Sequence, residues 1–202
     1  MSDNPMRRVT EKVMSDPGSW RSVCGEVLET FEALAPDWES RLGPAQLTSF
    51  AAGLRRVPPP ATALDLACGT GIAADLIAGT FPDAVVVGAD LSEQMVRTAL
   101  AKRRPHTVRF LVGDATALPF TDDAFGLISI LNGFAFADEL KRVLEPGGWV
   151  LVSYSAGEDT PIYAPFADLE RVLGSAGFVE IGHGRAGPGT WTTARTSADF
   201  DD

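Results

Sequence analysis

Ala63-Leu64-Asp65-Leu66-Ala67-Cys68-Gly69-Thr70-Gly71-Ile72-Ala73-Ala74 is the stretch around which the 202-residue chain is organised. Apolar residues interrupted by one acid, Asp65, and followed by Gly-x-Gly-x-x-Ala predict a short buried strand, a glycine turn and a helix start. The first glycine of such a turn permits the reversal, and the second lets a ligand approach the backbone. An unpaired carboxylate inside an apolar strand is costly, so we expect Asp65 to have a specific partner near the strand's carboxyl end.

The composition is typical of a soluble globular domain with one hydrophobic core. Hydrophobic residues make up 45% of the chain and charged residues 22%. No run approaches the roughly 18 apolar residues of a membrane helix. The first residues, Met1 to Pro5, are polar and lack an apolar signal core, so we expect a cytoplasmic protein that does not enter a membrane.

The charge and the cysteines limit the classes of partner. A formal net charge of −10 argues against a nucleic-acid partner, because binding to nucleic acid depends on Lys and Arg neutralising phosphates. Cys24 and Cys68 occur without a CxxC pair or a histidine cluster, so we expect neither a bound metal nor a disulfide. A small-molecule substrate fits this balance.

Proline and turn signals divide the chain into four parts. We predict a flexible N-terminal segment over residues 1–18, a helical cover over 19–60, an α/β core over 61–196 and an acidic tail over 197–202. Within the cover, Val23, Val27 and Phe31 recur at four-residue steps and predict an amphipathic helix over 19–35. A second helix is predicted over about 44–57.

The core alternates apolar runs with helical patterns. Strands are predicted at 63–66, 84–89, 108–112, 125–131, 149–154, 178–183 and 190–195, with helices at 71–79, after Ser92, at 137–144 and at 165–176. This order predicts an α/β fold, a Rossmann-like three-layer sandwich with a seven-stranded, mainly parallel sheet and a C-terminal antiparallel hairpin.

Three acids stand at the ends of neighbouring strands. Asp65 belongs to the first, Asp90 follows the second, and Asp114 follows the third within Gly113-Asp114-Ala115. An acid at the tip of the second strand faces a ribose bound over the glycine turn. The alternative is that the acids are helix caps or solvated turn residues. Their convergence on one sheet edge favours a ligand site.

Four motifs stand in register along the core: Leu64–Gly71, Val87–Met95, Gly113–Phe120 and Arg142–Gly148. Together they resemble the class I S-adenosylmethionine-dependent methyltransferases, in particular the small-molecule group that includes the menaquinone and ubiquinone methylases. The resemblance covers about residues 30–195 and implies S-adenosylmethionine as the cofactor.

The resemblance also implies roles for individual residues. Gly69 and Gly71 would approach the amino-acid portion of the cofactor, with its ammonium oriented by Asp65 directly or through water. Asp90 would bind the ribose hydroxyls, and Asp114 would accept from the adenine amino group. The full set of implied cofactor-binding residues is Asp65, Ala67, Gly69, Gly71, Asp90, Leu91, Met95, Asp114, Ala115 and Asn132.

A dinucleotide is the main alternative cofactor. It would use the glycine turn and Asp90 equally well, but it would not need Asp65 or the Gly-Asp-Ala after the third strand. The acids favour hydroxyls and an ammonium over a pyrophosphate, so the sequence favours the methyl donor.

The sequence says less about the catalytic residues than about the cofactor. Alignment of the acceptor behind the methyl group is the main requirement, and a general base is optional. Tyr163, in the loop after the fifth predicted strand, is the candidate substrate contact, and His183 is a second catalytic candidate; the alternative is that each one only packs. Trp20, Trp38, Phe134 and Phe136 predict an aromatic wall.

These features predict a methyltransferase acting on O, N or C of a small aromatic or apolar metabolite. The cofactor motifs would be unchanged in an enzyme of the same fold that uses the cofactor for cyclisation, and in a cofactor-binding regulatory protein without catalysis. No inserted cap closes the pocket in the sequence, so we expect it to be open or completed by a homodimer partner.

Overall fold

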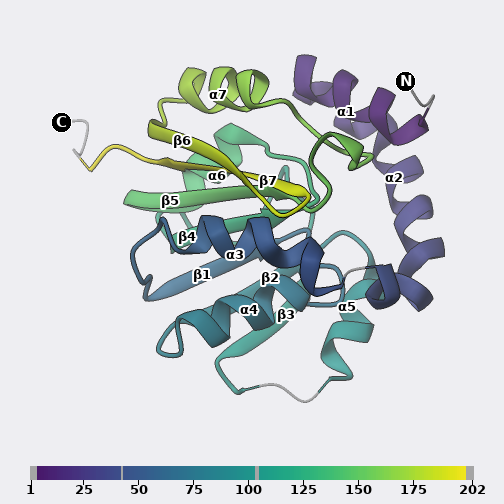
Figure 1. Cartoon of the computed structure of the whole chain (residues 1–202), viewed down its shortest axis with the longest axis horizontal. Coiled ribbons are helices and arrows are strands. Elements are labelled where there is room, and N and C mark those ends of the chain that lie inside the picture. Colours follow the sequence, from purple (N-terminus) through teal and green to yellow (C-terminus); the bar gives the residue numbers. More distant parts are fainter. Residues whose placement is uncertain (1–3, 42, 103–104, 199–202) are drawn as a thin grey trace.

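A computed structural model describes residues 4–41, 43–102 and 105–198. Its centre is a seven-stranded sheet in the order β3-β2-β1-β4-β5-β7-β6 (Figure 1). Five strands are parallel: β1 (Thr62–Leu66), β2 (Val85–Asp90), β3 (Val108–Val112), β4 (Phe125–Leu131) and β5 (Leu144–Tyr154). β7 (Gly189–Arg195) runs antiparallel to both β5 and β6 (Val179–Ala186). The predicted mainly parallel sandwich with a C-terminal hairpin is confirmed.

The central strands could be predicted from the sequence because they are apolar and buried. Every residue of β4 is buried, as expected for a central parallel strand covered by helices on both faces. β3 and β4 have the predicted bounds. β5 begins at Leu144, five residues before the predicted Trp149, because Leu144 pairs with Phe125 across a register shift.

Helices form the outer layers. One face carries α3 (Thr48–Leu54) and α4 (Ile72–Thr80), whose Phe50 and Ile77 pack with Leu127 of β4. The opposite face carries α6 (Ala137–Val143) and α7 (Phe166–Ser175), which pack on the other side of the same strands. α5 (Glu93–Leu100) lies against β2 and β3. The predicted second cover helix is split into a 3-10 turn, Pro44–Leu47, and α3, and α3 belongs to the core layer.

The N-terminal region differs from the predicted flexible segment. Residues Pro5–Ser15 form helix α1, and α2 spans Trp20–Leu34. Asn4 caps α1, because its side-chain oxygen accepts from the Met6 backbone N–H at 2.9 Å. Met6, Val9 and Val13 recur on one face of α1 and are buried. The predicted tail beyond residue 198 lies outside the described residues.

A third apolar cluster seats these two helices on the core. It joins buried side chains of α1 and α2 to the loop after β4 and to the loop before α7, through Phe134, Phe136 and Ile162. In Figure 1, α1 and α2 stand together at one end of the sheet. The cover therefore lies beside the loops at the carboxyl ends of the parallel strands.

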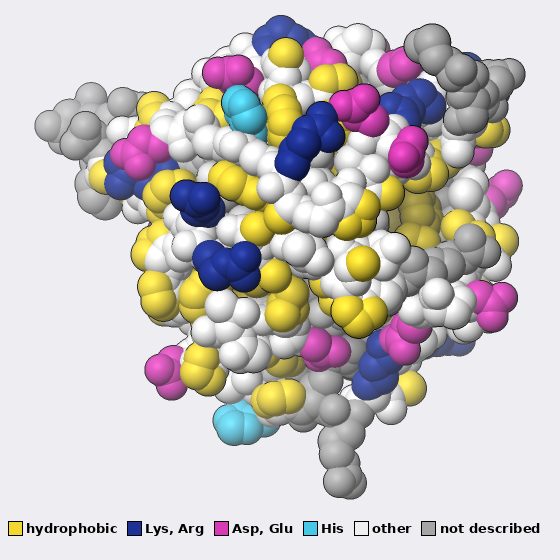
Figure 2. All heavy atoms as spheres, in the orientation of Figure 1, with side chains coloured by type: hydrophobic (Ala, Val, Ile, Leu, Met, Phe, Trp, Pro, Cys, Tyr) yellow, Lys and Arg dark blue, Asp and Glu magenta, His cyan; other side chains and the backbone are white. Residues whose placement is uncertain are grey.

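The surface carries scattered charge. On the face drawn in Figure 2, Lys and Arg side chains lie among acidic and apolar ones and do not gather into one basic patch. None of the helices in the described residues combines the length and the apolar character needed to cross a bilayer.

Substitution of two glycines, Gly53 in α3 and Gly25 in α2, tests how closely α3 packs on the sheet. Gly53 faces the sheet, and a Cβ there would overlap the buried Leu151 side chain and come within 3.3 Å of Trp191 Cβ. We expect Gly53→Ala to lower the free energy of unfolding by about 1–3 kcal/mol, although alanine is the better helix former. In Gly25→Ala, the matched control at an exposed position of α2, a Cβ meets nothing within 4 Å. This variant should gain about 0.5–1 kcal/mol. Urea unfolding measures both, and equal signs would contradict the packing argument.

Candidate cofactor and acceptor pocket

The glycine turn after β1 is held in place by Asp90 at the tip of β2. Asp90 Oδ2 accepts from the Gly69 backbone N–H at 2.8 Å, and Oδ1 accepts from the Ser92 backbone N–H at 2.9 Å. Gly69 and Gly71 have φ values of 52° and 86°, in the left-handed region that favours glycine. Burial raises the pKa of Asp90, and the amide donors of Ser92, Gly69 and Leu91 oppose this rise. Asp90 thus links the turn to the start of α5.

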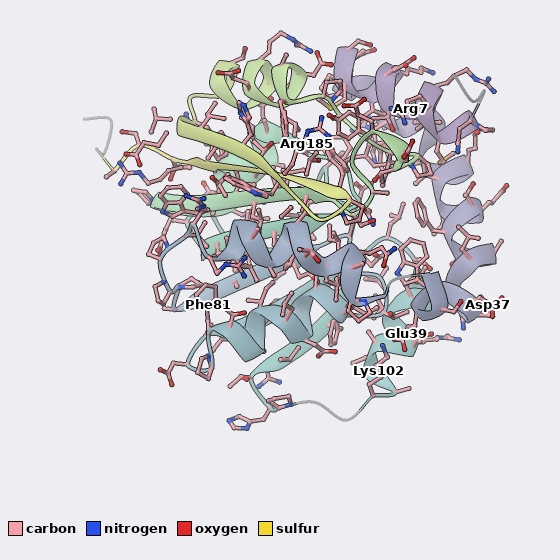
Figure 3. The ribbon with its side chains drawn as sticks, viewed as in Figure 1. Arg7, Asp37, Glu39, Phe81, Lys102 and Arg185 are labelled. Carbon is pink, nitrogen blue, oxygen red and sulfur yellow. The ribbon has the colours of Figure 1, made fainter. Side chains whose placement is uncertain are left out.

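The segment after α2 lies over the same turn. The 3-10 segment Ala35–Arg41 carries Trp38, and a Cβ on Gly69 would come within 3.1 Å of its indole nitrogen. Lys102 donates to the Thr70 carbonyl at 2.9 Å and forms an ion pair with Glu39. Figure 3 shows Glu39 and Lys102 close together, below Asp37. Glycine at position 69 is therefore required by its left-handed φ and by the close approach of Trp38.

Asp65 lies behind the turn. Its side chain is fully buried, and its Oδ1 accepts from the Ser129 hydroxyl at 3.0 Å. The second oxygen, Oδ2, makes no hydrogen bond of normal geometry with a described residue. Burial raises the pKa of Asp65 to about 7, although the Ser129 hydroxyl and the Ala74 backbone N–H lower it. Asp65 has the specific partner that the sequence predicts, on the neighbouring strand β4.

The end of β4 forms the adjacent wall. Asn132 has a φ of 56°, and its side-chain amide is held by Ser155 beyond β5: Nδ2 donates to Ser155 Oγ at 2.9 Å, and Oδ1 accepts from the Ser155 N–H at 2.8 Å. A Cβ on Gly133 would come within 2.9 Å of Ala67 Cβ. The loops after β1 and β4 are therefore in direct contact.

A pocket of about 720 Å³, including open solvent at its mouth, lies between these loops and the cover. Among the described residues, Asp90 is the one ionisable side chain on its wall. The structure brings together there the implied cofactor residues Ala67, Gly69, Asp90, Leu91, Met95, Ala115 and Asn132, and the aromatic residues Trp20, Trp38, Phe134 and Phe136.

Other candidates do not line this pocket. Asp65 and Gly71 lie behind its wall, and Asp114 is hydrogen-bonded to the Trp20 indole. Tyr163 is buried edge-on against Tyr154 at 5.3 Å, and burial raises its pKa. His183 is exposed on β6 and stacks on Phe166 at 4.4 Å. Neither catalytic candidate reaches the pocket in this structure.

Several lining residues were not assigned to the site from the sequence, among them Leu66, Gly133 and Ile162. Gly133 had a usable signal, because it directly follows Asn132 at the end of an apolar strand and a small residue there allows two loops to meet. Ile162 had none, because its place depends on the fold of the loop between β5 and α7.

Asp65 predicts a pH dependence of stability. Its pKa is about 7 in the folded protein against an ordinary value of 3.8. Between those values the folded protein binds a proton that the unfolded chain has released, so the free energy of unfolding falls as pH rises through this interval. Asp65→Asn should therefore gain stability relative to the wild type between pH 5 and 8, on the order of 1–3 kcal/mol.

Urea unfolding at several pH values measures the difference between the two proteins. Asp83→Asn, at an exposed turn, is the control for removal of a carboxyl outside the core. A pH-independent difference for Asp65→Asn would show that the Asp65 carboxyl titrates alike in the folded and unfolded chains.

Methyltransferases are similar to this chain in both sequence and fold. Residues 63–148 match the family model described as a methyltransferase domain. A demethylmenaquinone methyltransferase from Thermus thermophilus is 46% identical in a 104-residue alignment, with a coverage of 46% of this chain and 46% of the relative. The chain thus spans less than half the length of this relative.

Solved structures share the fold. A SAM-dependent methyltransferase from Aquifex aeolicus has a TM-score of 0.67 at 18% identity, covering 80% of this chain and 97% of its own. The cyclase SpnF has a TM-score of 0.61 at 22% identity, covering 77% and 81%. These two likenesses concern the fold alone. The chain is thus similar to methyltransferases in the sequence of residues 63–148 and in its fold.

Proposed function

We propose that the protein is an S-adenosylmethionine-dependent methyltransferase that acts on O, N or C of a small aromatic or apolar metabolite. The observation that carries the proposal is one pocket that joins a polar end, Asp90 with the glycine turn, to an apolar end built from aromatic side chains. The first end suits a ribose and an amino-acid group, and the second suits a flat apolar acceptor.

The residues present fit the cofactor. Asp90 is fixed by two backbone amides, and carboxylate oxygens have several lone-pair sites, so it retains capacity to accept from ribose hydroxyls. Leu91 and Met95 supply an apolar surface for adenine, next to the Ala115 backbone. The left-handed backbone at Gly69 lets a ligand approach the turn. Asp65 does not reach the pocket, so we assign it the indirect, water-mediated route to the ammonium.

When bound, the cofactor supplies a methyl group on a positively charged sulfur. The chain's own residues then have to align the acceptor and exclude water, and such positioning contributes about 7–11 kcal/mol in favourable cases. Trp20, Phe134 and Phe136 form a contiguous aromatic wall that does both. Because Asp90 is the one ionisable side chain on the described wall, the proposal assigns no side-chain base to the reaction. Acceptors that ionise by themselves, such as phenols, fit this arrangement.

The acceptor class follows from the same wall and from the relatives. A planar ring can stack among the aromatic side chains, and the name of the Thermus thermophilus relative refers to a menaquinone precursor. We infer a quinone-type or comparable aromatic acceptor.

Cofactor binding tests the proposal directly. We expect S-adenosylmethionine and S-adenosylhomocysteine to bind at micromolar levels in calorimetry, and NAD to give no signal. Asp90→Ala should weaken binding by about a hundredfold or more, because each hydrogen bond to a charged group contributes about 1.5–3 kcal/mol. Asp83→Ala, at an exposed turn, is the matched control. Tight NAD binding without a response to the sulfur ligands would refute the assignment.

Turnover tests the chemistry. We expect methyl-labelled cofactor, incubated with the protein and a panel of phenols and quinols, to transfer label into product. An unlabelled product with methylthioadenosine would point to the cyclisation-type alternative. Cofactor binding without turnover on any panel would favour a regulatory protein.

A further inference from the structure

The indole of Trp20 is bound to Asp114. Its Nε1–H donates to Asp114 Oδ1 at 3.0 Å and to Oδ2 at 3.2 Å, across 94 residues of sequence. Trp20 is 5% exposed and Asp114 is half-buried, so this contact is partly shielded from water. A hydrogen bond to a carboxylate is among the stronger ones in proteins. The start of α2 is therefore attached to the loop after β3.

The two oxygens of Asp114 are engaged unequally. Oδ1 also accepts from the backbone N–H and the hydroxyl of Thr116, both at 2.9 Å. Among the described residues, Oδ2 accepts only from the Trp20 Nε1–H, which it shares with Oδ1. Trp20 lines the pocket and Asp114 does not, although the adjoining Gly113 and Ala115 do. The indole thus stands between the Asp114 carboxylate and the pocket.

Neighbouring rings hold the indole in this position. Trp20 packs on Phe134 at 5.4 Å and on Phe136 at 5.3 Å between ring centroids. Later residues of the same helix, Val27 and Phe31, line the pocket. Helix α2 therefore contributes both Trp20 and part of the apolar half of the pocket.

We propose that Trp20 is a latch on the cofactor pocket. In the free protein the indole N–H donates to the Asp114 carboxylate, which is the acceptor that the adenine amino group would use. The adenine amino group replaces the indole N–H when the cofactor binds, and the indole returns when the cofactor leaves. The inference rests on the proposed function, because Asp114 can accept from adenine only if the pocket binds S-adenosylmethionine. Exchange keeps the half-buried carboxylate hydrogen-bonded in both states, since one N–H donor replaces another. Trp20 thereby lowers the affinity for both forms of the cofactor and favours release of the spent one.

Removal of the donor tests the latch. Trp20→Phe keeps a ring between Phe134 and Phe136 and deletes the N–H. We expect this variant to bind S-adenosylhomocysteine about ten- to a hundredfold more tightly than the wild type in calorimetry, the range for one hydrogen bond to a charged group. Trp149→Phe, on β5 away from the pocket, is the matched control and should bind as the wild type does. Damage to the fold would weaken binding, so a gain in affinity is not a trivial structural effect.

The wild-type protein gives a second, independent readout. The chain has four tryptophans, and loss of one indole resonance in Trp20→Phe assigns Trp20 in a nitrogen-15 spectrum. Addition of S-adenosylhomocysteine should shift this resonance toward the position of a solvated indole and speed its hydrogen exchange.

The outcomes separate the two proposals. Equal or weaker binding by Trp20→Phe, or a Trp20 resonance that does not move at saturation, would overturn the latch and leave the proposed function in place. A complete lack of binding by the wild type and both variants would overturn the proposed function and the latch with it.

Discussion

The carboxylate of Asp90 ties together the parts of the chain on which the pocket depends. It accepts from Gly69 in the turn after β1 and from Ser92 at the start of α5, so one side chain at the tip of β2 fixes the loops on both sides of it. Backbone N–H groups at a helix start lack helical partners and favour a negative charge. The Asp90 carboxylate thus has two roles: it satisfies these amides, and it presents an acceptor to a ligand.

Burial of the acids at this edge of the sheet lowers the stability of the folded protein. Desolvation raises the pKa of both Asp65 and Asp90, which means that the folded protein disfavours their charged forms. Asp65 is fully buried and has a single side-chain donor, Ser129. The fold can carry this penalty because the apolar clusters on both faces of the sheet are continuous. A carboxylate retained at such a cost, beside a pocket, is what a functional constraint would produce.

Much of the core could be predicted from the sequence because its signals are local. Phe125–Leu131 is a buried apolar run, and both it and the partly exposed edge strand Val108–Val112 have the predicted bounds. Parallel strands bring their carboxyl ends to one edge, so Asp90 and Asn132 meet at the pocket. The place of His183 follows from no local signal, because a register shift between Val179 and Gly182 decides which way β6 presents its side chains. Helix α1 had the pattern Met6, Val9 and Val13, but its polar composition masked it, and its docking site lies more than a hundred residues away.

The N-terminal cover is attached by contacts of very different strength. The Glu39–Lys102 ion pair is partly exposed, and such pairs contribute about 0–1 kcal/mol. The buried apolar side chains of α1 and α2 contribute far more, because each fully buried large one is worth about 1.5–3 kcal/mol. The Trp20–Asp114 hydrogen bond, at about 1.5–3 kcal/mol, is stronger than the ion pair and comparable to one such side chain, and its acceptor adjoins the pocket. The apolar seat can therefore keep the cover in place while Trp20 changes its partner, so that exchange at Asp114 does not require the helices to undock.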